Sequence, residues 1–166
     1  MDQQFMRTME SLCIQNEPPA CVTACPLHVD SRTMLKLVAS GKFEDAYSLY
    51  QKNVPFPSIL SKICNSPCLL KCRLSEIGEG IQIRPIEAFL NQYTDPSFLP
   101  KVLPEKRQKA GIFGSELDSL STAYDLRRKG YQVTILNADT VLAKNLRAFN
   151  EEILPSAEIE NAIRLL

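Results

Sequence analysis

Six cysteines in two groups, all within the first 72 residues, constrain this chain more than any other feature of its sequence. They are Cys13, Cys21, Cys25, Cys64, Cys68 and Cys72. Ten of the eleven prolines also lie at or before Pro104, whereas the residues beyond it have the pattern of ordinary α/β sequence. The composition therefore divides the chain near residue 105 into a part rich in cysteine and proline and a part of a different kind.

Length, charge and hydropathy exclude several classes of protein. The 166 residues suit one domain or two small ones, and 19 basic residues balance 19 acidic residues, which argues against binding to nucleic acid. No run approaches the roughly 20 apolar residues that cross a bilayer, so we expect no membrane insertion. Residues 1–10 lack the pattern of a secretory leader. We therefore expect a cytoplasmic protein, in which grouped cysteines bind metal or carry redox chemistry more often than they form disulfides.

Apolar residues at helical spacing predict a mainly α-helical N-terminal part. We expect helices over residues 3–12, 31–40, 43–50 and 85–90, with a short extended piece over 81–83. Asp30 or Ser31 is a suitable N-cap for the second of these helices, and Gly41 ends it.

The C-terminal part has the pattern of a β-α-β unit. We expect strands over residues 110–113 and 131–136, a helix between them that Gly130 ends, and further helices over 141–149 and 157–166. The expected organisation is thus a mainly α chain with a helical domain over residues 1–95, a linker over 96–109 and a partial β-α-β unit over 110–166.

The spacing between the cysteines favours iron–sulfur ligation. Residues 21–26 read Cys-x3-Cys-Pro, the end of a known pattern whose last cysteine binds a different cluster. Residues 64–72 place a cysteine at every fourth position, which on an unbroken helix would bring three thiols to one face. Pro67 opposes such a helix, because its ring would clash with the carbonyl of residue 63, so we expect the backbone to turn there.

Two other interpretations of the cysteines stay open. Zinc sites usually contain Cys-x2-Cys pairs and often histidine, whereas this chain has no such pair and one histidine, His28. Structural or disulfide-bonded cysteines are the second alternative, and disulfides need an oxidising compartment. We interpret His28 as a surface or helix-cap residue rather than a ligand.

Several stretches of the chain resemble one known family. They are Cys21–Pro26, Ile63–Cys68 with Cys72 beyond it, Ile81–Phe89 and Gly130–Thr134. Together they resemble the N-terminal α-helical iron–sulfur domain of the small subunit of NADPH-dependent glutamate synthase, which dihydropyrimidine dehydrogenase shares, followed by the start of a flavin-binding domain. The resemblance implies a helical, ferredoxin-like domain for two 4Fe–4S clusters, joined to a partial Rossmann-like unit.

The resemblance also implies which residues bind the clusters. One cluster takes the Glu87 set, which is Cys25, Cys64, Cys68 and Glu87, and the other takes the Asn16 set, which is Cys13, Asn16, Cys21 and Cys72. The family has cysteine in the second seat of Cys-x2-Cys-x4-Cys-x3-Cys-Pro, whereas here Asn16 stands there, and an amide is a poorer iron ligand than a thiolate. We therefore expect an intact cluster on the Glu87 set. We expect the other cluster to be absent, to have a 3Fe–4S form or to take an outside ligand.

The turn that would receive a nucleotide departs from the family pattern. A Gly-x-Gly-x-x-Gly turn lets backbone N–H groups approach a pyrophosphate at a helix N-terminus. Here only Gly114 remains, since Glu116 and Ser119 replace the other glycines, and Asn137 stands where an acidic residue would hold the ribose. We therefore expect no FAD or NAD(P) on this chain. We interpret residues 110–166 as a truncated flavin-domain remnant that docks on a partner.

These features together predict a function without substrate chemistry. The chain contains no paired-carboxylate motif and only one histidine, so we expect no catalytic residues. We expect an iron–sulfur electron-transfer subunit that relays single electrons between the redox centres of larger, flavin- or metal-containing oxidoreductase subunits. The alternatives are a non-redox assembly protein with zinc or structural cysteines, and a flavin-dependent NAD(P)H oxidoreductase subunit.

Overall fold

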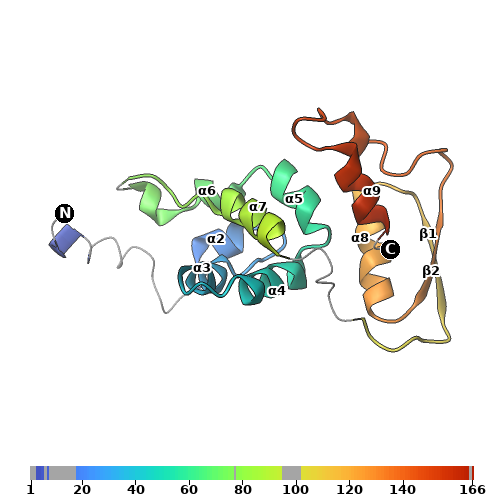
Figure 1. The fold of residues 1–166 in the computed structure, drawn as a ribbon, viewed down its shortest axis with the longest axis horizontal. Coiled ribbons are helices and arrows are strands. Elements are labelled where there is room, and N and C mark those ends of the chain that lie inside the picture. Colours follow the sequence, from blue (N-terminus) through green and yellow to red (C-terminus); the bar gives the residue numbers. More distant parts are fainter. Residues whose placement is uncertain (1–2, 6, 8–17, 77, 95–101, 165) are drawn as a thin grey trace. The chain divides into compact units, whose positions relative to one another are not determined.

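The computed structural model describes residues 3–5, 7, 18–76, 78–94, 102–164 and 166 (Figure 1). This part of the chain is mainly helical and contains a small two-stranded parallel sheet. The chain divides into two compact units: the first comprises Met1–Val54 and Cys64–Asp95, and the second comprises Pro55–Ile63 and Pro96–Leu166. The short segment Pro55–Ile63 thus belongs to the second unit, although it lies between the two cysteine groups. Within the described ranges, no helix has both the length and the apolar character needed to span a bilayer.

Short helices build the first unit. They are α2 (Ala20–Ala24), α3 (Ser31–Ala39), α4 (Phe43–Asn53), α6 (Pro67–Leu70), the 3-10 helix η1 (Arg73–Glu76) and α7 (Ile83–Tyr93). The predicted N-cap of α3 is confirmed, because the Asp30 carboxylate accepts a hydrogen bond from the Thr33 N–H at 3.1 Å. Gly41 follows α3 with a φ of 72°, a left-handed conformation that glycine adopts at low cost.

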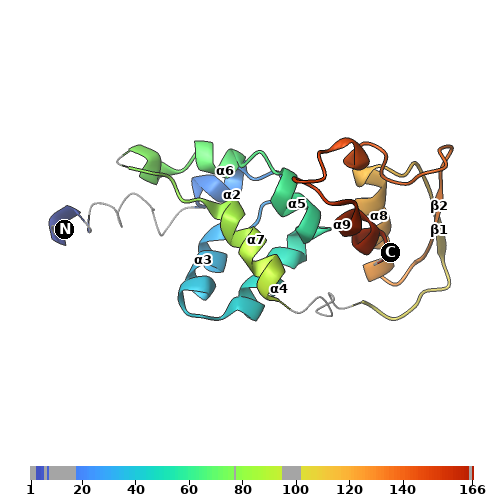
Figure 2. The ribbon, with the colours of Figure 1, turned by 45° about the horizontal axis from the view of Figure 1, so that its top comes forward.

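Helix α4 is central to the first unit, since it packs against both α3 and α7 (Figure 2). Tyr50 on α4 is 2% exposed, and Met34 on α3 and Leu90 on α7 have no exposed surface. The predicted extended piece before Pro85 is wrong, because Ile83 already begins α7 and is buried in its first turn. Proline fits a first turn, where its missing N–H has no intrahelical partner to lose.

The second unit contains the predicted β-α-β arrangement. Its elements are α5 (Pro57–Ile63), β1 (Lys109–Phe113), α8 (Leu117–Arg128), β2 (Gln132–Leu136), the 3-10 helix η2 (Leu146–Ala148) and α9 (Ser156–Arg164). The two strands pair in parallel, and α8 and α9 lie on the same side of the sheet (Figures 1 and 2). Gly130 ends α8 as predicted, and a Cβ there would lie 2.2 Å from the Pro104 carbonyl oxygen, so the position requires glycine.

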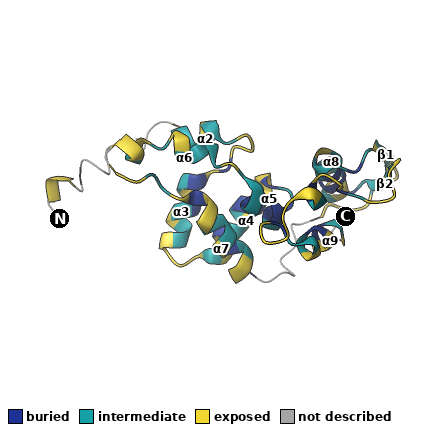
Figure 3. Ribbon diagram, turned by 90° about the horizontal axis from the view of Figure 1, so that it is seen from above, coloured by how far each residue is buried: buried dark blue, intermediate teal, exposed yellow. Residues whose placement is uncertain are grey.

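The sheet has one face that no described part of this unit covers. Both strands are coloured intermediate or exposed in Figure 3, and exposed residues alternate with partly buried ones along β1. Phe113 and Leu136 are register partners, and they are 82% and 47% exposed. Parallel sheets are usually covered on both faces, so this pair marks a surface suited to contact with further protein.

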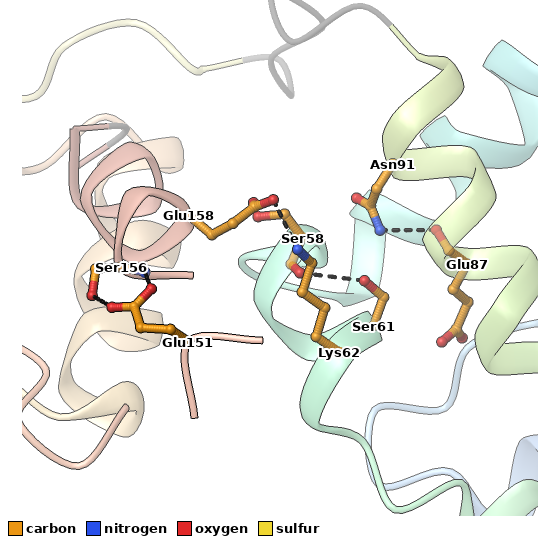
Figure 4. A network of polar contacts seen from close by, with 8 residues as sticks. All are labelled: Ser58, Ser61, Lys62, Glu87, Asn91, Glu151, Ser156 and Glu158. Atoms are coloured by element: carbon orange, nitrogen blue, oxygen red, sulfur yellow. Dashed lines mark hydrogen bonds and ion pairs between the residues drawn. The ribbon is translucent and has the colours of Figure 1, made fainter. Parts of the chain in front are cut away.

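The core of the second unit joins residues that are far apart in the sequence. Its buried members are Phe56, Ile59, Leu120, Tyr124, Ala143, Leu146, Leu154, Ile159 and Ala162. The rings of Phe56 and Tyr124 lie 5.3 Å apart, and Lys62 on α5 forms a 3.0 Å ion pair with Glu158 on α9 (Figure 4). Helix α5 is therefore an integral part of this unit.

The helix predicted over residues 141–149 is wrong, because only Leu146–Ala148 forms a short 3-10 helix. Two backbone N–H groups of this segment donate hydrogen bonds to the turn before α8 instead of to carbonyls of a helix of their own. The Ala143 N–H donates to the Ser115 carbonyl at 2.9 Å, and the Asn145 N–H donates to the Glu116 carboxylate at 3.1 Å. Tertiary hydrogen bonds thus replace the helical ones that apolar spacing suggested.

Substitution Ile59→Ala tests whether α5 stabilises the second unit. Ile59 is 1% exposed, so the variant should lower the free energy of unfolding by about 2–5 kcal/mol through lost burial and a cavity. Chemical denaturation measures this change. Ile153→Ala is the matched control, because Ile153 is 51% exposed in the same unit and should cost less than about 0.5 kcal/mol. Equal effects from the two variants would contradict the assignment of α5 to this core.

Acid should weaken the start of α9 through Glu151. Its carboxylate accepts hydrogen bonds from the Ser156 N–H, at 2.9 Å, and from the Ser156 hydroxyl (Figure 4). These bonds hold the pKa of Glu151 below its ordinary value of 4.5. Because the folded-state pKa is the lower one, the stabilisation is fully present above pH 4.5 and is lost as the pH falls through the folded pKa.

The variant Glu151→Gln should therefore have a lower Tm at neutral pH and a smaller loss of Tm on acidification than the wild type. Circular dichroism melts across this pH range measure both quantities. Glu152→Gln is the control, because Glu152 is the exposed neighbour and should keep the wild-type profile. A Glu151→Gln profile that matches the wild type would count against this role.

Candidate metal centre

Backbone hydrogen bonds hold Cys21 and Cys25, the described members of the first cysteine group, on one turn. The Cys25 N–H donates to the Cys21 carbonyl at 3.2 Å, and the Cys25 carbonyl accepts from the His28 N–H at 3.0 Å. The Asn53 side chain at the end of α4 donates to the His28 carbonyl at 3.1 Å. The exposed His28 ring lies 3.3 Å from the Val22 carbonyl, which agrees with its interpretation as a surface residue. The Cys25 thiol is thus presented by a loop that α4 anchors.

Pro67 interrupts the second cysteine group, as predicted. Residues 64–66 are not helical, Ser66 has a left-handed φ of 53°, and Pro67 begins α6. This turn directs the Ser66 N–H at the Cys64 sulfur, 3.4 Å away. The Arg84 guanidinium on α7 donates to the Cys64 carbonyl at 3.0 Å. Cys64 is therefore held both by its own turn and by α7.

The structure brings the four members of the Glu87 set within electrostatic range of one another. Burial is the main cause that raises the pKa of the Cys68 thiol, and the charges of the other three members raise it further. Burial also raises the pKa of Glu87 to about 6, against a hydrogen bond from Tyr50 that lowers it. Four potential ligands from three segments of the chain therefore lie within electrostatic range of one another in a partly buried region.

Tyr50 belongs to this region, although the sequence did not identify it as functional. Its hydroxyl hydrogen-bonds the Glu87 carboxylate, and its side chain is almost fully buried on α4. Burial is the largest cause that raises the pKa of the phenol, and the charges of Glu87, Cys64 and Cys25 add to it. The apolar spacing of the predicted helix marked Tyr50 only as a core residue, and no other signal in the sequence distinguishes it.

The Asn16 set lies partly outside the described residues, which include neither Cys13 nor Asn16. Cys21 lies in α2, which packs against α6, and Cys72 comes shortly after α6. A Cβ at Gly80 would lie 3.3 Å from the Cys72 Cβ, so the Gly80 backbone closely approaches this cysteine. The five described cysteines are all half-buried, and none of them forms a disulfide within the described ranges.

The chemistry of the Glu87 set fits an iron–sulfur cluster. Thiolates are the usual ligands of such clusters, and hydrogen bonds to their sulfurs help to set the reduction potential. The Ser66 N–H donates such a hydrogen bond to the Cys64 sulfur. Among the residues that the structure describes, no three His, Cys, Asp or Glu side chains are placed to hold a single metal ion. A cubane binds each ligand at a different corner, so it suits ligands that converge on a region rather than on a point.

The turn between β1 and α8 keeps only part of a nucleotide-binding geometry. A Cβ at Gly114 would lie 2.8 Å from the Ser119 hydroxyl, and Gly114 has a φ of 105°, so this position requires glycine. Glu116 uses its carboxylate to accept the Asn145 N–H, and the Asp118 carboxylate accepts the Ser119 N–H at 2.7 Å. A pyrophosphate would therefore meet two carboxylates and a backbone N–H that already has a partner.

An open pocket of about 460 Å³ adjoins this turn. Its lining residues are Glu116, Leu117, Asp118, Ser121, Asn145, Leu146 and Phe149. After β2, the Asn137 amide donates to the Asp139 carbonyl at 2.8 Å. Like charges repel, so the acidic lining opposes a phosphate, and the residues present do not fit a dinucleotide.

Several known oxidoreductase subunits are similar to this chain. NADPH-Fe(3+) oxidoreductase subunit beta of Geobacter sulfurreducens is 28% identical over 71% of this chain and 18% of its own length. Glutamate synthase [NADPH] small chain of Azospirillum brasilense is 29% identical over 74% of this chain and 27% of its own length. The protein of that name from Mycobacterium tuberculosis is 26% identical over 88% of this chain and 30% of its own length. The chain thus spans less than a third of each of these relatives.

A family model also matches this chain, and the match covers more than half of it. The family is described as dihydropyrimidine dehydrogenase domain II, 4Fe-4S cluster, and the match covers residues 2–97. That range contains all six cysteines and Glu87. The similar oxidoreductase subunits and the turn at Pro67 agree with this match. The chain belongs to the 4Fe–4S family of dihydropyrimidine dehydrogenase domain II.

Proposed function

We propose that this chain is an iron–sulfur electron-transfer subunit of a larger oxidoreductase, and that it relays single electrons between redox centres of its partners. The convergence of the Glu87 set in a partly buried region is the observation that supports this proposal most strongly. An iron–sulfur cluster supplies one-electron chemistry when it is bound there. The relatives named as an NADPH-Fe(3+) oxidoreductase subunit and a glutamate synthase [NADPH] small chain favour larger oxidoreductase subunits as partners, and we propose that these contain flavin or metal centres.

Each residue of the Glu87 set has a defined part in this proposal. The thiolates of Cys25, Cys64 and Cys68 bind iron, and the Glu87 carboxylate is the fourth ligand. The Ser66 N–H stabilises charge on the Cys64 sulfur, and the hydrogen bond from Arg84 fixes the Cys64 backbone. The protein therefore binds, orients and partly shields the redox centre, and it contributes no proton transfer of its own.

The Asn16 set completes the proposal with a second, altered cluster site. Cys13, Cys21 and Cys72 would supply three thiolates there, and Asn16 would leave the fourth position without a strong ligand. This cluster is absent, has a 3Fe–4S form or takes an outside ligand. The first unit would then have the two-cluster ferredoxin-like fold with one cluster intact.

The second unit, in this proposal, has a Rossmann-like origin and serves in assembly rather than in nucleotide binding. Its exposed pair Phe113 and Leu136 lies on the uncovered sheet face and offers an apolar surface to a partner subunit. The bond from Asn145 to Glu116 supports the absence of FAD and NAD(P), because it uses the turn for contacts within the chain.

Cysteine-to-serine variants test the assignment of the two sets. Cys68→Ser should remove most of the visible absorbance of anaerobically purified protein, because it takes a thiolate from the intact cluster. Cys13→Ser should remove much less, because its cluster already lacks a strong ligand at Asn16. Absorbance spectra with iron and sulfide analysis measure both effects.

Equal losses from Cys68→Ser and Cys13→Ser would contradict this assignment. A wild-type content of about eight iron atoms per chain would contradict the altered second cluster, since two complete cubanes hold that number. Colourless anaerobic protein that contains zinc would favour the assembly-protein alternative and would reject the electron-transfer proposal.

Flavin binding provides a separate test on the second unit. Protein that is incubated with FAD, desalted and precipitated with acid should release no yellow flavin into the supernatant. Glu116→Ala should lower the free energy of unfolding by about 1 kcal/mol, because the Asn145 N–H loses its acceptor, and it should not create FAD binding. Stoichiometric FAD on the wild type would overturn this part of the proposal and would favour the flavoprotein alternative.

A further inference from the structure

The chain crosses between its two compact units twice within a short stretch. It leaves the first unit after Val54 and returns to it at Cys64, and the residues between them belong to the second unit. Helix α5 forms most of this stretch, and it ends at Ile63, directly before Cys64. A proposed cluster ligand is therefore the first residue after an element that belongs to the second unit.

Two kinds of contact hold α5 in the second unit. Ile59 is 1% exposed in the apolar core, and Ile63, the last residue of the helix, packs against the same core. The Lys62 ammonium forms an ion pair with the Glu158 carboxylate on α9 at 3.0 Å, and the two side chains are 29% and 32% exposed (Figure 4). The second unit thus holds the chain up to the residue that precedes Cys64.

Contacts within the first unit act on Cys64 itself. The Arg84 guanidinium on α7 donates to the Cys64 carbonyl at 3.0 Å, and the Ser66 N–H donates to the Cys64 sulfur at 3.4 Å. Cys25 follows α2, and Cys68 lies in α6, so both are surrounded in the sequence by residues of the first unit. Among the three cysteines of the Glu87 set, Cys64 is thus the one next to the second unit.

We propose that α5 positions the Cys64 thiol as a cluster ligand, because the second unit anchors this helix through Ile59, Lys62 and Ile63. This inference rests on the proposed function. Metal ligands are commonly oriented by contacts that lie outside the ligand set, and anchoring of the preceding residue limits the freedom of Cys64 in the same way. Local opening of α5 would release this constraint, so contacts that close α5 onto the second unit should keep Cys64 in place.

Charge reversal at Glu158 tests this coupling in the anaerobic full-length protein. Glu158→Lys places two ammonium groups opposite each other at the ion pair with Lys62, and Glu158 itself is distant from Cys64 in the sequence. In a brief pulse of iodoacetamide, the ratio of the initial labelling rates of Cys64 and Cys68 should rise about two- to fivefold, the factor that corresponds to loss of one partly exposed ion pair. Mass spectrometry of the labelled peptides measures the ratio.

The bound cluster gives a second readout of the same coupling. Glu158→Lys should keep the wild-type circular dichroism and iron content, but it should lose iron to a chelator about two- to fivefold faster. Its reduction potential and electron paramagnetic resonance signal should also shift, because the surroundings of one thiolate change. The double variant Lys62→Glu/Glu158→Lys restores an ion pair of opposite sense and should return every readout to its wild-type value.

Asp139→Lys is the matched control, because it makes the same change at another ion pair of the second unit. Asp139 lies 3.8 Å from Lys144, and neither residue belongs to α5. This variant should leave the labelling ratio, the iron release and the reduction potential at their wild-type values. Equal effects of Asp139→Lys and Glu158→Lys would overturn the inference, because the effect would then come from the charge of the unit rather than from α5.

The outcomes separate this inference from the function on which it rests. An unchanged labelling ratio in Glu158→Lys, or a double variant that does not recover, would overturn the role of α5 and leave the proposed function intact. A wild-type protein without iron and sulfide would overturn the proposed function. The labelling ratio needs no cluster, so it would still show in that case whether α5 holds Cys64.

Discussion

Bringing three thiols and a carboxylate together in a partly buried region is the constraint on which the proposed cluster site of the first unit depends. Burial disfavours the charged forms of these groups and raises the pKa values of both Cys68 and Glu87, and at Cys68 the charges of the other three members raise it further. A bound cationic centre reverses this balance, because it attracts each negative ligand. Under the proposed function, binding of a cluster would therefore be coupled to the folding of the first unit.

The lengths of the helices agree with this coupling. The helices next to the cysteines are short, since α2 has five residues and α6 has four, and helices of that length have little stability alone. The longer α3, α4 and α7 bury Met34, Tyr50 and Leu90 and supply a core without the cluster. A preformed core thus fixes Glu87 and the loop of Cys25, while a cluster would hold the short helices against it.

Local sequence signals predicted much of this fold, and long-range packing accounts for what they missed. Asp30 and Pro67 act through contacts within a few residues, and Gly130 ends α8 with a left-handed φ of 86°, so their effects could be predicted. The place of α5 depends on the burial of Phe56 and Ile59 against residues beyond position 110, which no spacing pattern encodes. At the site, cysteine spacing and the family resemblance indicated the Glu87 set, whereas Tyr50 could be found only from the packing of α4 on α7.

In the second unit, negative charges also determine what the chain can bind, since carboxylates at the turn between β1 and α8 repel an anionic ligand. Where a nucleotide-binding turn leaves backbone N–H groups open to an anion, this chain places the carboxylates of Glu116 and Asp118 and pairs them with its own N–H groups. The bonds from Asn145 to Glu116 and from Ala143 to the Ser115 carbonyl hold this segment on the turn, where its spacing predicted a helix. Glu116 thus contributes, together with Asp118, to the poor fit to a dinucleotide, and it also helps to hold the irregular segment after β2.

Partial burial of the cysteines reconciles two requirements of an electron-transfer site. A cluster far from water needs less reorganisation of its surroundings when its charge changes, whereas a cluster deep in a core lies far from any partner. The five described cysteines are all half-buried, and the apolar core of the first unit is formed by other residues such as Met34 and Leu90. The first unit therefore obtains its stability from a core beside the cysteines, which leaves the thiols half-buried, as the proposed exchange of electrons with a partner would require.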